Sequence, residues 1–256
     1  MPVDFFYSIP NSKLLLLFVG GLVILSLGGM YIFDQVIGDG LKSFDNGDTG
    51  TYISIVSIAT ALIIAFIVSN EWQAYSKNKE SLTKEAGTIY VLIKTLEHIK
   101  NSEKAMSIAK KYLNSIITDE FDQMKTGKLE QINPYLDELQ PLIYGFKSSD
   151  SHDQTLSDKS IDLLNTVILF RRERLEMSIT GTPRELWWML SIGFSMIIMM
   201  TWFLNGNMLY RVSMTTFVAI TYASMLFLAI ALDFPFKGEF GLAPTAFELI
   251  QTKLSI

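Results

Sequence analysis

Residues 52–69 read YISIVSIATALIIAFIVS and carry no charged side chain. Three other runs are equally free of charge: 14–33, 186–204 and 212–232. A helix rises about 1.5 Å per residue, so about 20 apolar residues cross a hydrocarbon core about 30 Å thick. Four such runs in one chain favour membrane spans over the buried helices of a soluble core. The sequence therefore predicts an all-α integral membrane protein with four transmembrane helices.

The composition excludes several classes of protein. Of the 256 residues, 49% are hydrophobic and 18% are charged, whereas a soluble domain carries about 25% charged residues. The net charge of −5 argues against a nucleic-acid partner, because such proteins neutralise phosphates with basic side chains. The chain has no cysteine, which excludes disulfides, thiolate nucleophiles and cysteine metal sites.

The first apolar run has a second interpretation, a cleaved signal peptide. Only Lys13 precedes it, against Asp4, and no clean small-residue cleavage site follows. The run is also long for such a peptide, so we expect it to be kept as a membrane span.

The positive charge is concentrated in one stretch of the chain. Sixteen of the 21 Lys and Arg residues lie between residues 70 and 185. The 34–51 loop holds one lysine, Lys42, and four aspartates: Asp34, Asp39, Asp45 and Asp48. Because cytoplasmic loops are enriched in Lys and Arg, the sequence predicts that 70–185 and both termini are cytoplasmic.

This orientation divides the chain into four parts. Residues 1–69 form the first helix pair with an acidic external loop, and 70–185 form a cytoplasmic helical insert. Residues 186–232 form the second helix pair, and 233–256 a cytoplasmic C-terminal segment. In the insert, apolar residues recur at three and four up to Leu96, which predicts a helix. No Pro or Gly pair separates the second span from Glu71 and Trp72, so the span and this helix are predicted to form one long rod. The same spacing predicts helices over 102–125 and 156–179, with a polar loop at 148–155.

Sequence signals for a helix start and a helix end occur at the beginning of the third span and after the last span. Thr182, Pro183 and Glu185 match a capping box at the start of the third span. After the last span, Pro235 stops the helix and Gly238 permits a tight turn. Asp233 lies at the C-terminus of that helix, where a negative charge is unfavourable unless it is paired. We expect Lys237 or one of the arginines before the third span to pair with it. We expect this turn to dock on the insert.

Nothing in the sequence points to catalysis. The two histidines, His98 and His152, lie far apart, and a zinc site needs three or four converging ligands. No phosphate-binding loop, dinucleotide fingerprint or hydrolase motif occurs. We therefore expect no enzyme activity, no metal and no cofactor.

The second span carries an ordered pattern of small and bulky residues. Ser54, Ser57, Ala61 and Ala65 share one face, and Ile58, Leu62 and Phe66 form an adjacent stripe. Small residues allow close helix packing, which is one interpretation. The other is a pore lining with an apolar constriction.

Three arginines before the third span are also ambiguous: Arg171, Arg172 and Arg174. They either face anions in a cytoplasmic vestibule or form an ordinary basic flank paired with Glu173 and Glu176.

Several stretches resemble a bacterial membrane family of unknown function called bestrophin-like. They are AFIVSNEWQAY (65–75), KEAGTIYVL (84–92), KKYLNSIITDEFDQM (110–124), LLNTVILFRRERLEM (163–177), PRELWWML (183–190) and LDFPFKGEFGLAP (232–244). The matches cover most of the chain from the second span onward and stand in family order. The first 50 residues match only as a hydrophobic segment.

The resemblance implies a pentameric ring in a bacterial inner membrane, with a pore lined by the second span. Ser54, Ser57, Ile58, Ala61, Leu62 and Phe66 would then line a path for small ions, anions by preference. This chain lacks the proline-containing neck motif and the acidic calcium cluster of bestrophins proper, so calcium gating is not expected. The alternative is a non-conducting scaffold or sensor whose cytoplasmic helices bind a partner.

Overall fold

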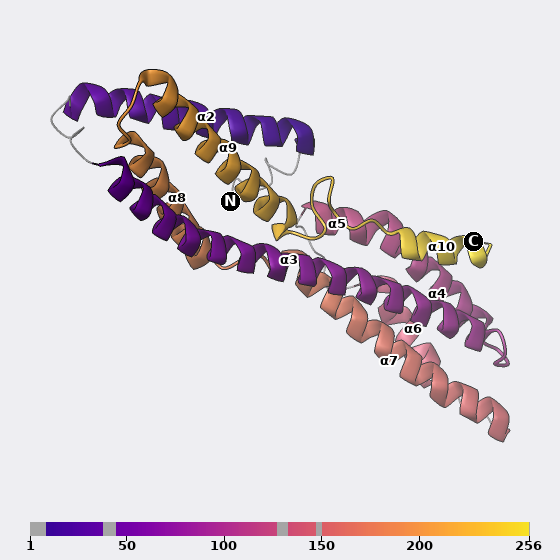
Figure 1. The fold of residues 1–256 in the computed structure, drawn as a ribbon. Coiled ribbons are helices and arrows are strands. Elements are labelled where there is room, and N and C mark those ends of the chain that lie inside the picture. Colours follow the sequence, from indigo (N-terminus) through magenta and orange to yellow (C-terminus); the bar gives the residue numbers. More distant parts are fainter. Residues whose placement is uncertain (1–8, 38–44, 127–132, 147–149, 256) are drawn as a thin grey trace. The chain divides into compact units, whose positions relative to one another are not determined.

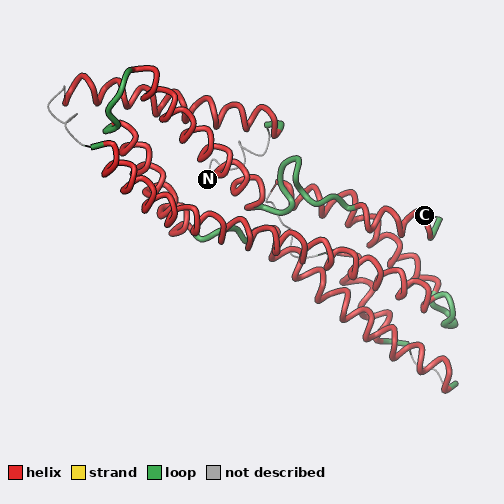
Figure 2. The backbone as a smooth tube through the Cα atoms, in the orientation of Figure 1, coloured by secondary structure: helices red, strands yellow, loops and turns green. Residues whose placement is uncertain are grey.

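The computed structural model describes residues 9–37, 45–126, 133–146 and 150–255, which form helices and connecting turns without a strand (Figures 1 and 2). The chain divides into two compact units. The membrane unit consists of Met1–Gln73 and Gly181–Asp233, and the insert unit of Ala74–Thr180 and Phe234–Ile256. An all-α fold is confirmed for the described residues.

The membrane unit holds the four predicted spans. They are α2 (Asn11–Ile37), the first part of α3 (Asn46–Leu96), α8 (Arg184–Trp202) and α9 (Met208–Asp233). All four belong to helices long and apolar enough to cross a membrane. The helices α2, α3 and α9 extend past the apolar runs at both ends, because flanking polar residues keep the helical backbone.

Close packing inside the membrane unit depends on small and aromatic side chains. α9 packs on both α2 and α8. The rings of Phe194 on α8 and Tyr222 on α9 lie 4.5 Å apart, and Ile64 of α3 joins the same cluster. A Cβ atom at Gly193 would lie 2.5 Å from Oγ1 of Thr60, so only glycine permits this approach of α8 to α3.

The predicted long rod is confirmed. α3 is one helix of 51 residues, Asn46–Leu96, and contains no proline. Its first 28 residues belong to the membrane unit and those from Ala74 onward to the insert unit.

Within the described residues, the insert unit packs seven helical elements around one apolar core. Besides the end of α3 they are α4 (Glu103–Ser115), the π-helix η2 (Ile116–Glu120), α5 (Phe121–Thr126), α6 (Pro134–Tyr144), α7 (Ser151–Ile179) and α10 (Thr245–Lys253). The core is dry, since Ile93, Leu113, Leu139, Leu164 and Phe247 are fully buried. The predicted helix over 102–125 exists, but η2 interrupts it.

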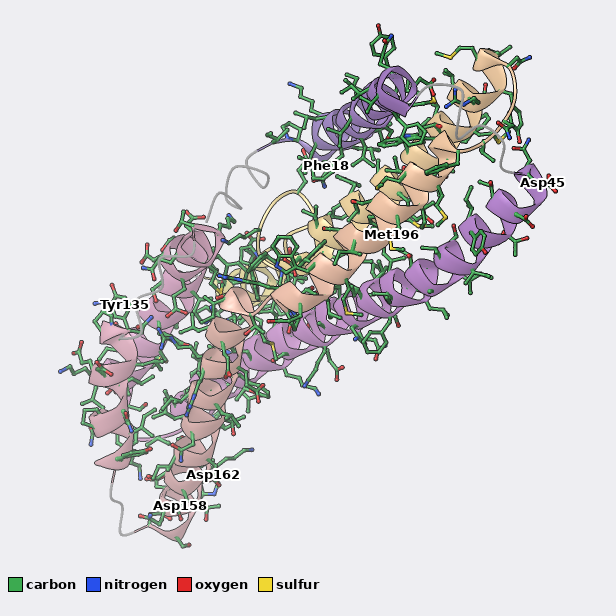
Figure 3. All side chains as sticks on the ribbon, turned by 90° about the vertical axis from the view of Figure 1, so that its left-hand side faces the viewer. Phe18, Asp45, Tyr135, Asp158, Asp162 and Met196 are labelled. Carbon is green, nitrogen blue, oxygen red and sulfur yellow. The ribbon has the colours of Figure 1, made fainter. Side chains whose placement is uncertain are left out.

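The predicted polar loop at 148–155 is wrong from residue 151 onward, and residues 148 and 149 lie outside the described residues. α7 begins at Ser151, where the Asp150 carboxylate accepts a hydrogen bond of 3.0 Å from the His152 amide. Some of its polar residues lie on an exposed face, on which Asp158 and Asp162 project away from the bundle (Figure 3), whereas Asp153, Ser157 and Ser160 are buried. The first turns of an exposed helix were thus mistaken for a loop.

The capping box predicted at Thr182 is also wrong. Pro183 occupies the N-cap position of α8 and makes no side-chain cap. Thr182 is held elsewhere: its hydroxyl donates to Oε1 of Glu71 at 2.7 Å, and its amide to Oδ1 of Asp233 at 2.6 Å. Carboxylates from α3 and α9 therefore hold the residue that precedes α8. Asp233, which was expected to pair with Lys237 or an arginine, instead accepts this hydrogen bond from Thr182.

Candidate functional site

A stripe of side chains on α3 is exposed and is not covered by any other part of the chain that the structure describes. Ile58, Leu62 and Phe66 are 64%, 68% and 61% exposed, and residues four apart lie above one another on a helix. Ser54 and Ala61 are exposed beside them. We call these five residues the α3 stripe.

The opposite side of α3 is packed. Thr60, Ile64 and Ile67 are buried against the rest of the membrane unit. Ser57 lies three residues before Thr60 and seven before Ile64, so it faces the same way, and its hydroxyl lies 3.2 Å from that of Tyr222. The structure therefore separates Ser57 from the other five predicted lining residues.

A half-buried ion pair joins α2 and α9, and it was not expected from the sequence. The Arg211 guanidinium donates to both carboxylate oxygens of Asp34, at 2.8 and 2.9 Å, and to the Trp202 carbonyl at 2.8 Å. Asp34 was grouped with the acidic external loop, although it lies inside α2. Asp39 and Lys42 of that loop lie outside the described residues.

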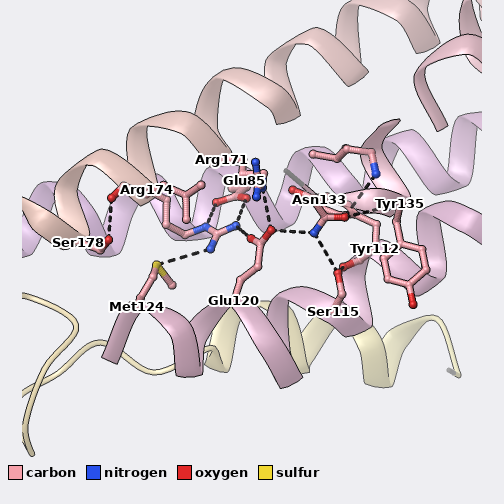
Figure 4. Close-up of polar contacts among 12 residues, drawn as sticks. Glu85, Tyr112, Ser115, Glu120, Met124, Asn133, Tyr135, Arg171, Arg174 and Ser178 are labelled. Atoms are coloured by element: carbon pink, nitrogen blue, oxygen red, sulfur yellow. Dashed lines mark hydrogen bonds and ion pairs between the residues drawn. The ribbon is translucent and has the colours of Figure 1, made fainter. Parts of the chain in front are cut away.

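The insert unit contains a second buried set of charges, Glu85, Glu120, Arg171 and Arg174, which we call the arginine cluster (Figure 4). Arg174 donates to both oxygens of Glu85, at 2.8 and 3.1 Å, and to Glu120 at 2.6 Å. Arg171 donates to Glu120 at 2.7 Å. The cluster joins α3, η2 and α7 and balances two positive with two negative charges.

Neighbouring residues make further contacts to the charged groups of the arginine cluster. The Asn133 side-chain amide donates to Glu120 at 2.7 Å, and its oxygen accepts from the first amides of α6. The Arg174 guanidinium carbon lies 5.8 Å from the ring centres of both Phe121 and Phe247, within reach of a cation–π attraction. Charge-assisted hydrogen bonds of this kind stabilise a core only when each buried charge is paired, as here.

Burial and the charges of the cluster shift the pKa of its member Glu120 and of the nearby Tyr112. Burial alone would raise the pKa of the Glu120 carboxyl, but the charges of Arg174 and Arg171 outweigh it and hold that pKa below its ordinary value of 4.5. Burial also raises the pKa of the Tyr112 hydroxyl well above 10, with the negative charges of Glu85 and Glu120 adding to the effect. Glu120 is therefore an ionised partner for both arginines at neutral pH.

Of the two interpretations given for the three arginines, facing anions does not fit Arg171 and Arg174, because both are buried. They bond to glutamates of other helices, whereas the alternative expected Glu173 and Glu176. Arg172 is exposed. A signal for the cluster was present in the sequence, because Glu85 interrupts the apolar stripe formed by Leu82, Ala86 and Ile89.

Backbone hydrogen bonds within the turn after α9 stabilise it. The Lys237 amide donates to the Phe234 carbonyl at 3.1 Å, and the Leu242 amide to the Pro235 carbonyl at 2.8 Å. Gly238 has a φ of 71°, which favours glycine. Phe236 is buried against Phe121 of α5, with ring centres 6.0 Å apart, so the turn packs into the insert core.

The model of the bestrophin-like domain family matches residues 20–247. The chain belongs to the bestrophin-like family. Its fold is similar to that of a substituted form of a bacterial bestrophin homologue from Klebsiella pneumoniae, with a TM-score of 0.68 and 17% identity over 94% of this chain and 97% of that one. Another crystal structure of the Klebsiella pneumoniae homologue gives a TM-score of 0.65 at 17% identity, covering 94% and 95% of the two chains.

At this level of identity the likeness shows that the bestrophin-like chain shares the fold of these homologues. Both the family predicted from the sequence motifs and the helical membrane fold are confirmed. No curated protein matches the sequence.

Proposed function

We propose that copies of this chain form a ring in the membrane and conduct small ions along a central pore lined by the α3 stripe. One observation carries the proposal: Ile58, Leu62 and Phe66 form an exposed apolar line on a helix whose opposite side is packed. A ring of such lines forms an apolar constriction, which opens and closes by wetting and dewetting.

The ring is needed because four spans are too few to enclose a water path comfortably. Closed cyclic symmetry places the same helix of each copy on the axis. The resemblance to bestrophins favours five copies in a bacterial inner membrane. The excess of Lys and Arg in residues 70–185 favours a cytoplasmic position for the insert unit and for both termini.

The preference for anions rests on the family resemblance alone. Of the three arginines considered for a vestibule, Arg171 and Arg174 are paired with glutamates, and Arg172 is exposed. Asp45 and Asp48, before and at the start of α3, favour cations at the other end of the proposed path.

The test is the conductance of the purified protein in planar bilayers under a salt gradient. Discrete currents with a defined reversal potential are expected, and Leu62→Ala and Phe66→Ala should raise the open fraction because the constriction widens. Leu25→Ala is the matched control, since Leu25 is as exposed but lies on α2, away from the stripe. Silence of all variants with intact oligomers would favour the non-conducting scaffold.

A further inference from the structure

The insert unit contains a groove that the proposed conduction does not use. It is a cavity of about 600 Å³ between α3 and the segment from Gly241 to Lys253. Tyr75, Lys79, Leu82 and Ala86 on α3 form one wall, at spacings of three and four that place them on one face. Its volume lies within the range of about 300–1,000 Å³ that is usual for pockets holding one small molecule.

Most of the groove lining is apolar. Leu82 and Leu242 are buried at its sides, whereas Leu249 of α10 lies in the lining and is 60% exposed. An apolar side chain gains free energy when hydrocarbon replaces water next to it. The groove therefore suits the hydrocarbon part of a ligand.

The charge of the groove is entirely positive. Its charged lining residues are Lys79 and Lys253, and no carboxylate lines it among the described residues. Neither lysine has an ion-pair partner in the part of the chain that the structure describes. Five other lysines of the insert unit do have one: Lys84, Lys94, Lys100, Lys104 and Lys125. The groove therefore favours an anionic group.

A glycine near the C-terminal end of α3 keeps the groove open. Glycine destabilises a helix interior relative to alanine, so its presence needs a reason. A Cβ atom built at Gly87 would meet nothing within 4 Å, so close packing is not that reason. Gly87 instead borders the cavity, with Ala86, Ala243 and Ala246 as further small lining residues.

We infer that this groove binds a long-chain fatty acid, with its carboxylate at Lys79 and Lys253 and its chain over the leucines. The α3 residues of the groove begin at Tyr75, six residues after the apolar run ends at Ser69. A ligand must therefore leave the bilayer to enter. Extraction costs about 0.8 kcal/mol per methylene group, which disfavours a phospholipid with two chains against a single-chain acid.

The test uses the full-length protein in lipid nanodiscs and a photoreactive palmitate, with labelled peptides mapped by mass spectrometry. The label should map to the peptides containing 75–87 and 241–253, and excess unlabelled palmitate should compete with it. Gly87→Leu, which fills the groove, should abolish this labelling. Gly87→Ala is the matched control and should retain it, because a methyl group leaves most of the space.

The role of the lysines is tested separately. The double variant Lys79→Gln and Lys253→Gln should lower the affinity for the acid about tenfold, as expected for loss of charge-assisted hydrogen bonds. Labelling by the corresponding photoreactive alcohol should be weak in the unsubstituted protein and unaffected by this change.

Labelling confined to the membrane spans would overturn the inference, as would labelling that persists in Gly87→Leu. Unchanged melting temperature and oligomeric state of Gly87→Leu would show that it folds. If instead Gly87→Leu splits the oligomer and no peptide of the groove is labelled, a second copy of the chain covers the groove and the inference is wrong.

Discussion

Each of the two units buries an arginine, and the two arginines are partnered differently. In the insert unit, Arg174 is 1% exposed and has two glutamates, a methionine sulfur and two aromatic rings around it. In the membrane unit, Arg211 has one carboxylate and one carbonyl, and its Nε finds no hydrogen-bond partner within the described part of the chain.

The two arginines differ in how much buried negative charge each one compensates. Arg174 stands between two carboxylates that are almost completely buried, so removing it leaves negative charge in a dry core. The Asp34 side chain keeps 24% of its surface exposed, so less negative charge is left fully buried when Arg211 is absent. Buried charges therefore constrain the insert unit more tightly than the membrane unit.

The largest effect is expected from Arg174→Met. It should destabilise the insert unit by about 3–5 kcal/mol, because Glu85 and Glu120 remain buried and lose a shared partner. Hydrogen exchange of the peptides covering 103–126 measures the loss. Arg172→Met is the control and should stay within about 0.5 kcal/mol, since Arg172 is exposed. Equal protection in both variants would contradict the assigned role of the cluster.

A smaller loss is expected from Arg211→Met, about 1–3 kcal/mol, because Asp34 is partly solvated. The unfolding midpoint of the purified protein and exchange of the α2 and α9 peptides measure it. The double variant with Asp34→Asn should lose less than the two single variants added together, because the residues interact directly. Strictly additive losses would mean that the pair is not coupled.

The smallest effect is expected from acidification. The folded pKa of Glu120 lies below its ordinary value of 4.5, so the unfolded chain takes up the proton first as pH falls. The contribution of Glu120 is therefore complete above about pH 4.5 and is lost as pH falls through the folded pKa. Hydrogen exchange of the insert peptides between pH 6 and pH 3 should show this loss, with Glu120→Gln less dependent on pH. An equal slope in both proteins would exclude Glu120 as the titrating group.

The membrane spans and the long rod could be predicted because each depends on a local, periodic pattern. Charge-free runs fixed the spans, and the absence of proline after residue 69 indicated that α3 continues. The family motifs could also be recognised, since they are short stretches of contiguous residues.

The partners of the charged residues could not be predicted in the same way. Arg174 meets Glu85 across 89 positions of sequence, and Arg211 meets Asp34 across 177. The position of Arg174 or Arg211 in the sequence does not indicate which distant carboxylate it pairs with. The π-helix was also invisible, because η2 keeps helical spacing on both sides and differs only by its wider turn.

That wider turn has a consequence for chain length. A π-turn holds one residue more than an α-helix can accommodate in register, so losing any one residue from Ile116–Glu120 restores an unbroken α-helix. One residue of a regular α-helix corresponds to about 100° of rotation about the helix axis. Because the π-turn absorbs the extra residue, losing one of residues 116–119 leaves the helices on both sides facing as before, whereas the same deletion within α4 would turn Glu120 away from both arginines. Alignments of relatives should therefore show single-residue gaps at η2 with Glu85 and Arg174 unchanged, and none within α4.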